Sequence, residues 1–282
     1  MSDIFEIIRN RKSCRTYIPG IITPAVRQEL TEFMNQTCTG IFGNETIQFQ
    51  WIERNYSTDT PMKLNYGTIT NHSNYIIGKA AFNKESYVDY GYLLEKIVLK
   101  ATELGLGTCW IGYFDAKYFP EVKKNRGEYI PSLIIVGNAA PRKKVSEKIT
   151  RYFVKADARK EWKDLFFLGS PENPLDKSQA GKYINALEML RLAPSSGNSQ
   201  PWRLIRENNT DCFHFYRKTV HPLYQKRGLH DVDLGICMSH FEMAAIHYHL
   251  NGKWESIAGL NNYTTLNLEY IISWSGDCGN ES

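Results

Sequence analysis

"VDYGYLLEKIVLKATELGLGTCW", residues 88–110, decides the fold because a related stretch occurs later in the chain. The second stretch is "VDLGICMSHFEMAAIHYHLNGKW", residues 232–254, displaced by 144 positions (254 − 110). Apolar residues recur every three or four positions, which predicts two long helices, one after Asp89 and one after Asp233. The buried face of the first is expected to hold Leu94, Ile97, Val98, Ala101 and Leu104. Along that face only the change of Val98 to Glu242 breaks the match.

Other segments also occur in pairs, in the same order. Each half reads as helix, polar loop, strand, strand, long helix, glycine turn and strand. We therefore predict an internal duplication with units at 1–150 and 151–282, folded together as a pseudo-dimer within one chain. The alternative is a chance coincidence of amphipathic helices and polar loops. The paired segments are "GIFGNETIQFQWIE" (40–53) with "PSSGNSQPWRLIRE" (194–207), "NYIIGKA" (74–80) with "CFHFYRK" (212–218), and "SLIIVGN" (132–138) with "EYIISWS" (269–275).

The composition of the chain limits the classes of function that it is expected to have. The chain has 282 residues, 42% of them hydrophobic, which is enough for a sizeable core. Its net charge of +4 is compatible with small anionic ligands, but no basic helix or zinc-finger spacing favours nucleic-acid binding. No apolar run reaches the roughly 20 residues of a membrane span. The N-terminal "MSDIFEIIRNRKS" lacks the apolar core of a secretory signal, so we expect a cytoplasmic protein.

Cysteine and histidine spacing does not predict a metal site. The six cysteines form no C-x-x-C pair and are expected to be free, mostly buried thiols. His240, His247 and His249 cluster at the second long helix, but no acid or cysteine set completes a site there. We expect these histidines to form a surface-facing stripe.

A basic motif lies near the N-terminus. In "IIRNRKSCRTY" (residues 7–17), Arg11, Lys12, Ser13 and Arg15 follow a short helix expected from Ile4 to about Arg9. Arginine supplies forked donors, lysine a point charge and serine one more donor, so the group is able to surround a phosphate. The alternative is a solvated basic turn.

Two further motifs contain glycine and polar residues. In "ELGLGTCWIGYFD" (103–115), two glycines end the helix and let backbone approach a ligand, and residues 110–112 present an extended segment. In "APSSGNSQPW" (193–202), four polar side chains surround a glycine turn. Taken singly, these are equally compatible with an ordinary helix cap before a strand and with a plain loop.

The three motifs together resemble those of the nitroreductase-like FMN flavoproteins, over nearly the whole chain. The single-chain, duplicated branch known as putative TM nitroreductase is the most similar in style, with "LNYGTITNHSNYIIG" and "GKYINALEMLRLAPSSGNSQPW". The resemblance implies an α+β, nitroreductase-like fold. Each unit would be a small, mostly antiparallel sheet with helices packed on it, and the units would be joined through the long helices.

The resemblance also implies site residues for FMN. Four residues of the basic motif, Arg11, Lys12, Ser13 and Arg15, would hold the phosphate, with Arg151 completing the site and Lys148 as second choice. Residues of the second unit would reach across to the flavin, namely Pro194, Ser195, Ser196 and Asn198. Trp110, Ile111 and Gly112, with Tyr113 as a further candidate, would lie against the isoalloxazine, and a backbone N–H would face N5. No catalytic side chain is implied, since the flavin carries the chemistry.

The implied activity is that of an FMN-dependent oxidoreductase that uses NAD(P)H to reduce nitroaromatics, quinones or similar small acceptors. We expect one FMN per chain, because the second unit has "RKEWK" (159–163) where the first has "RKSCR". One alternative is a non-catalytic FMN protein for storage or redox sensing. Another is different flavin chemistry, such as dehalogenation or flavin cleavage; relatives of that kind carry a substrate lid, which the sequence does not identify, although 55–72 is the best place for one. We expect a monomer with a small-molecule electron acceptor and neither nucleic-acid nor membrane partners.

Overall fold

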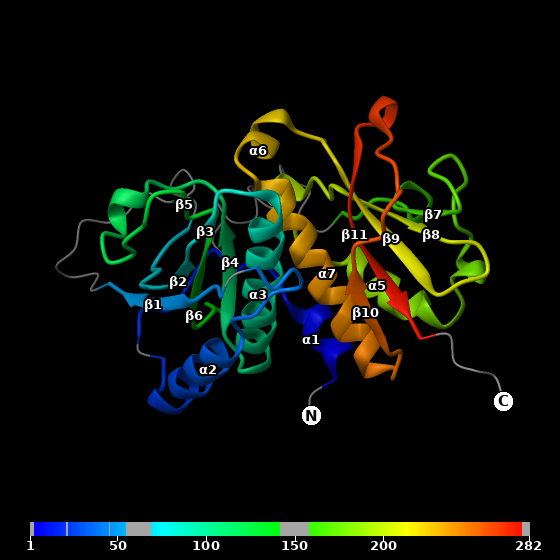
Figure 1. The fold of residues 1–282 in the computed structure, drawn as a ribbon. Coiled ribbons are helices and arrows are strands. Elements are labelled where there is room, and N and C mark those ends of the chain that lie inside the picture. The colour runs from blue at the N-terminus through cyan, green and yellow to red at the C-terminus, as the bar shows by residue number, and fades with distance from the viewer. Residues whose placement is uncertain (1–2, 21, 45, 55–68, 142–157, 278–282) are drawn as a thin grey trace. The chain divides into compact units, whose positions relative to one another are not determined.

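The computed structural model describes residues 3–20, 22–44, 46–54, 69–141 and 158–277. The chain folds as two compact units, residues 1–157 and 158–282 (Figure 1). Each unit combines a sheet with helices, so the mixed helix-and-sheet class predicted from the sequence is confirmed. The unit boundary predicted at residue 150 falls outside the described residues.

The main sheet of the first unit has the strand order β1-β2-β6-β4, and every neighbouring pair in it is antiparallel. A small ribbon pairs β3 with β5. The short helix predicted from Ile4 is confirmed and extends to Asn10. The elements are α1 (Ile4–Asn10), α2 (Pro24–Gln36), β1 (Phe49–Glu53), β2 (Asn74–Gly78), β3 (Ala80–Ala81), α3 (Lys84–Glu103), β4 (Gly107–Ile111), β5 (Glu128–Tyr129) and β6 (Leu133–Gly137).

Helix α3 is the long helix predicted first, but it begins before Asp89, not after it. Asn83 caps its N-terminus, because the Asn83 side chain accepts a hydrogen bond from the backbone N–H of Ser86 (2.8 Å). Asp89 lies inside the helix and is buried. Its Oδ1 accepts the backbone N–H groups of Ile41 (2.6 Å) and Phe42 (3.1 Å). Four of the five predicted face residues are buried; Leu104, at the C-cap, is partly exposed.

The sheet of the second unit has the order β10-β11-β9-β8-β7. Only the β7–β8 pair is parallel among the neighbouring strands described. Its elements are β7 (Phe166–Leu168), α5 (Ile184–Arg191), β8 (Trp202–Arg206), β9 (Cys212–Lys218), α6 (Pro222–Lys226), α7 (Leu229–His247), β10 (Gly252–Glu255) and β11 (Leu268–Gly276).

The two sheets share one strand order. Strands β1-β2-β6-β4 of the first unit correspond in sequence order and pairing to β8-β9-β11-β10 of the second. In each unit a long helix lies in the chain between the second and the third of these strands in sequence order: α3 lies between β2 and β4, and α7 lies between β9 and β10. Strand β7 has no counterpart in the main sheet of the first unit, within the residues described.

Helix α7 begins at Leu229, four residues before Asp233 and not after it, and follows Gly228 in the left-handed conformation (φ 70°). Every residue from Leu229 to Phe241 is buried, as expected for a helix that packs on all sides. The predicted surface stripe of histidines is therefore wrong for His240. That side chain is fully buried, and its Nδ1 lies 3.1 Å from the backbone carbonyl oxygen of Met189. His247 and His249 are exposed.

Candidate functional site

The N-terminal basic motif lies against the edge of the first sheet. Residues 13–18 form an extended segment beside β4, the last strand in that sheet. The backbone N–H of Cys14 donates to the carbonyl of Thr108 in β4 (2.8 Å). On the other side, the carbonyl of Arg15 accepts the N–H of Thr70 (2.9 Å). The structure thus brings the basic motif and the strand after the glycine turn together within one unit.

Arg15 is the most informative residue of the motif. Its side chain is buried, with a relative exposure of 8%. Within the described residues, its Nε and Nη1 atoms are buried and have no hydrogen-bond partner. A buried guanidinium without acceptors loses hydration and gains nothing in exchange, which is costly. The arrangement fits an anion whose oxygens would accept those two N–H groups.

The remaining residues of the motif differ in burial. Arg11 is as buried as Arg15, whereas Lys12 is exposed and Ser13 is partly exposed. The Nε of Arg11 lies 3.9 Å from Oε1 of Glu95, a fully buried carboxylate of α3. The motif therefore combines two buried guanidinium groups with one exposed lysine, Lys12. It is not a solvated basic turn.

Glu95 links the motif to the strand after the glycine turn. Its Oε2 accepts the indole Nε1–H of Trp110 in β4 (2.7 Å), while Oε1 faces Arg11. The sequence analysis missed Glu95. The sequence did contain a signal for it: Glu95 is a carboxylate next to Leu94, on the predicted apolar face of the first long helix. A carboxylate at such a position needs partners, and two of them are residues of the predicted site.

The strand β4 presents alternate residues to its two faces. Cys109 and Ile111 pack into the core on one face, and Trp110 lies on the face that meets α3. Backbone groups of a strand alternate in direction, so the N–H of Trp110 points to the same edge as the Thr108 carbonyl that binds Cys14. Tyr113, beyond the strand, is 64% exposed. Trp110 is therefore the predicted residue best placed to donate from the backbone beside the basic motif.

The polar loop predicted to reach the flavin belongs to the second unit, as residues 194–200. Its side chains are engaged within that unit. Ser195 Oγ accepts the N–H of Gln200 (2.9 Å), and the amide of Asn198 donates to the carbonyl of Ala158 (3.0 Å). Ser196 donates to Asp233 Oδ1 from both its N–H (2.8 Å) and its hydroxyl (3.1 Å). These contacts fix the shape of the loop, with Gly197 at φ 58°. The flanking Pro194 is partly exposed.

Two predicted features lie outside the described residues. Arg151 and its alternative Lys148 fall in 142–157, and most of the stretch named as the best place for a lid, 55–72, falls in 55–68.

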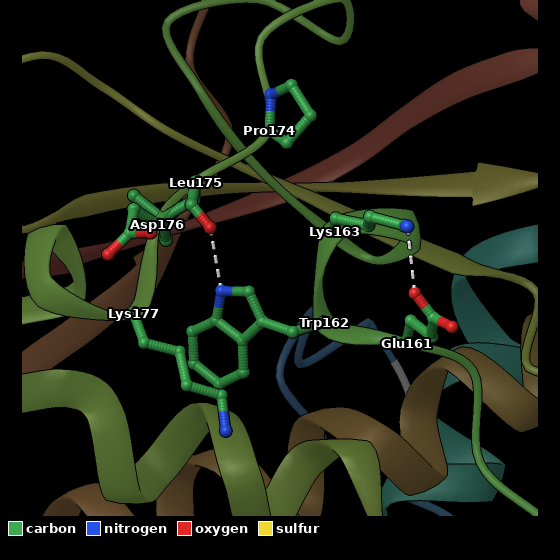
Figure 2. A pocket seen from close by; sticks show the side chains of 7 residues that line it. All are labelled: Glu161, Trp162, Lys163, Pro174, Leu175, Asp176 and Lys177. Atoms are coloured by element: carbon green, nitrogen blue, oxygen red, sulfur yellow. Dashed lines mark hydrogen bonds and ion pairs between the residues drawn. The ribbon is translucent and has the colours of Figure 1, made fainter.

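The second unit has a different arrangement where the first has its basic motif. Glu161 and Lys163 occupy the sequence positions that correspond to Ser13 and Arg15, and they pair with each other at 2.9 Å. Both are exposed. They line an open pocket of about 300 Å³ together with Trp162, whose indole donates to the carbonyl of Leu175 (Figure 2). An exposed lysine already paired with an acid does not reproduce the buried Arg15.

Asp233 is a buried carboxyl on α7. Burial raises its pKa to about 8, although the two hydrogen bonds from Ser196 act in the opposite direction. Its Oδ2 has no hydrogen-bond partner within the described part of the chain. The group is therefore protonated at neutral pH in the folded protein.

We expect the protonation of Asp233 to make stability fall as pH rises. Between its unfolded pKa near 3.8 and about 8, the folded state binds the extra proton, so the unfolding free energy decreases by up to about 1.4 kcal/mol per pH unit. The change Asp233→Asn removes this slope. Urea titrations from pH 5 to 9 measure it, with the exposed Glu172→Gln as control. An unchanged slope in Asp233→Asn would contradict the assignment.

The family follows from comparison with known proteins. The sequence matches the family described as "Putative TM nitroreductase" over residues 3–245. The chain belongs to this family. The resemblance drawn from the motifs is thereby confirmed. Within the described residues, this nitroreductase-family chain has no helix that is both long and apolar enough to cross a membrane.

One solved structure shows the same fold at low sequence identity. A putative nitroreductase from Thermotoga maritima MSB8 is 20% identical, with a TM-score of 0.62, and the match covers 96% of this chain and 93% of that one. A nitroreductase with bound FMN from Desulfitobacterium hafniense DCB-2 is 17% identical with a TM-score of 0.41, covering 51% of this chain and 92% of its own. Among curated proteins, no relative matches the chain.

Proposed function

We propose that this nitroreductase-family chain is an FMN-dependent oxidoreductase. The observation that carries the proposal is the buried guanidinium of Arg15, whose Nε and Nη1 have no acceptor within the described residues. It lies in the segment bonded to β4, where a flavin phosphate would supply the missing oxygens. Arg11, Lys12 and Ser13 would add donors, and Arg151 would complete the phosphate site.

We also propose that the chain is a duplicated pseudo-dimer. Its support is the shared strand order and a shared contact, since Asp89 in α3 and Asp233 in α7 each hold the loop before the first of the four corresponding strands. Pro194, Ser195, Ser196 and Asn198 are proposed to contribute to flavin binding. One FMN per chain is proposed, because the exposed Lys163–Glu161 pair replaces the buried arginine in the second unit.

In the proposed enzyme the cofactor would transfer the electrons, and the protein would bind and orient it. Bound FMN would supply two-electron transfer from NAD(P)H to a nitroaromatic, quinone or similar small acceptor. The residues of this chain would bind and orient it: Arg15 and Arg11 at the phosphate, and the backbone of Trp110 to Gly112 at the ring. Positive charge near the site would stabilise an anionic reduced ring. No side chain is required as a general acid.

The test is cofactor content followed by turnover. The purified chain is expected to carry about one FMN, counted by native mass spectrometry and identified by the mass of the released flavin. Anaerobic NADH or NADPH should bleach the flavin absorbance, and an added quinone or nitroaromatic should restore it. Flavin that stays oxidised under both donors would refute the reductase and leave a storage or sensing protein. Two FMN per chain would refute the single-site proposal.

Location and assembly complete the proposal. We propose a cytoplasmic protein without nucleic-acid or membrane partners. We also propose that it is a monomer, because a duplicated chain already carries both units that a homodimer would supply. Light scattering on the eluting protein measures the assembly. A mass of about twice the 32.5 kDa chain would contradict the monomer.

A further inference from the structure

The sheet of the second unit brings together an acid, a thiol and an imidazole that the flavin site does not use. Glu207 follows β8, and Cys212 and His214 stand two positions apart on β9, so their side chains share one face of the sheet. The turn between the strands closes through the N–H of Glu207, which donates to the carbonyl of Cys212 (3.0 Å). The sequence analysis expected no metal site, because Glu207 enters the group only through this hairpin.

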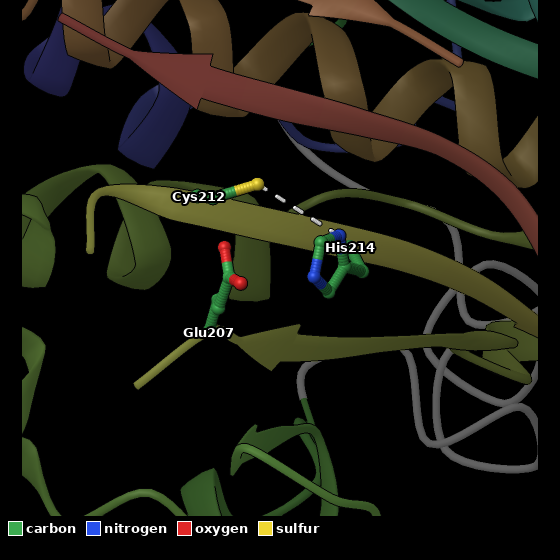
Figure 3. Close-up of side chains that lie close together, drawn as sticks. All are labelled: Glu207, Cys212 and His214. Atoms are coloured by element: carbon green, nitrogen blue, oxygen red, sulfur yellow. Dashed lines mark hydrogen bonds between the residues drawn. The ribbon is translucent and has the colours of Figure 1, made fainter. Parts of the chain in front are cut away.

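The geometry suits one small cation. A carboxylate oxygen of Glu207, the sulfur of Cys212 and a ring nitrogen of His214 all lie within 4.8 Å of one another. Ligand atoms of one tetrahedral zinc, bonded at about 2.0–2.3 Å, lie about 3.4–3.6 Å apart. The three side chains therefore need to move by about 1 Å. Figure 3 shows the sulfur of Cys212 directed toward Nδ1 of the ring, 3.8 Å away, and the other ring nitrogen, Nε2, on the side that faces Glu207.

The neighbouring strand supports the imidazole in a way that favours metal binding. His214 Nδ1 lies 2.9 Å from Ser273 Oγ in β11, and Ser273 Oγ lies 2.8 Å from the hydroxyl of Tyr270. That hydroxyl is in turn held by the N–H of Ile257 (3.0 Å). A histidine that ligates a metal commonly donates its other ring N–H to such a fixed group. With Nδ1–H directed to Ser273, the Nε2 lone pair is available toward Glu207.

We propose that Glu207, Cys212 and His214 bind one zinc-class divalent cation on this outer hairpin of the second unit. Thiolate, imidazole and carboxylate are the donors that zinc takes in proteins, and three protein ligands leave the fourth position to water. Cys212 and His214 are nearly buried, at 8% and 7% relative exposure, while Glu207 is exposed and opens the site to solvent. The cation would join the ends of β8 and β9.

Cobalt is the probe, because a thiolate–Co²⁺ bond gives a charge-transfer absorption band. The full-length, untagged, reduced chain is stripped with chelator and titrated with Co²⁺ and then Zn²⁺. We expect one equivalent of Co²⁺, a thiolate band, and loss of the band on adding Zn²⁺. Cys212→Ser should abolish the band, and Glu207→Gln should weaken Co²⁺ binding at least tenfold. The second-sphere change Ser273→Ala should weaken it about tenfold.

The controls make the result specific. Cys38→Ser changes a half-buried thiol of the first unit and should leave the band unaltered. Glu207 is exposed, so Glu207→Gln tests the site even if the Cys212 variant does not fold. The proposal is overturned if saturating Co²⁺ gives no thiolate band, if the band survives in Cys212→Ser, or if it is lost in Cys38→Ser.

Discussion

The change Arg15→Met should weaken FMN binding by at least about 100-fold and leave riboflavin binding within about twofold of the parent. Hydrogen bonds to charged groups contribute about 1.5–3 kcal/mol each, and two buried N–H groups of Arg15 are available to a phosphate. Each 1.4 kcal/mol is about a tenfold change in affinity. Riboflavin has no phosphate, so its affinity should not depend on the Arg15 guanidinium. Fluorescence titration of the flavin-free protein measures both constants.

The same variant, Arg15→Met, should be more stable than the parent protein when no flavin is bound. A buried guanidinium that lacks acceptors destabilises the empty protein, so Arg15→Met is expected to raise the unfolding temperature of the flavin-free form. Arg15→Lys should restore only part of the FMN affinity, because lysine has no forked donors. Arg9→Met, an exposed arginine on α1, is the matched control and should change neither quantity. Equal losses of FMN and riboflavin affinity would show that Arg15 does not bind the phosphate.

Replacing Glu95 with leucine should lower the unfolding free energy by about 3 kcal/mol. Removing one partner of a buried ion pair costs about 3–5 kcal/mol because the other charge stays buried. Here Arg11 would face an apolar side chain, and the indole N–H of Trp110 would lose its acceptor. Glu95→Gln keeps an acceptor for Trp110 and should cost less. Urea unfolding monitored by tryptophan fluorescence measures both variants.

The second unit provides a matched control for Glu95. The indole of Trp254 donates to Glu242 (2.9 Å), as Trp110 does to Glu95, but Glu242 is only partly buried. Glu242→Gln should therefore cost about 1 kcal/mol or less. If Glu95 acts by positioning Arg11, then Glu95→Gln should weaken FMN more than riboflavin. A stability loss with an unchanged ratio of the two affinities would leave Glu95 a purely structural role.

Much of the fold was predictable because the apolar runs are long. The segments at 74–80, 132–138 and 212–218 contain the strands β2, β6 and β9, and the segment at 269–275 lies within β11. The starts of the long helices were wrong, because an aspartate near a helix start is typical of a cap, and Asp89 and Asp233 instead bind a loop from inside the helix. Strand β7 was missed because it has only three residues, which are too few to show an alternating pattern.

The sequence supplied candidate site residues by type, but it did not supply their pairwise contacts. The basic motif and the segment after the glycine turn were both identified, and the structure places them side by side. Which arginines are buried could not be read from "RNRKSCR", since burial depends on β4 and α3. Glu95 and the Glu207 group were missed for the same reason. Their partners come from other elements, and no local spacing encodes such contacts.

The extended segment at 13–18 is bonded to three distant parts of the chain. Besides Thr108 in β4, it pairs with Thr70, and the N–H of Ala140 donates to the carbonyl of Thr16 (2.9 Å). Contacts of such sequence separation form slowly, because long loops must close before they stabilise anything. During synthesis the basic motif is made before these partners, and it acquires its final surroundings only after residue 140 has been made. The nascent first unit therefore cannot bury Arg11 and Arg15 in their final surroundings until most of that unit has been synthesised.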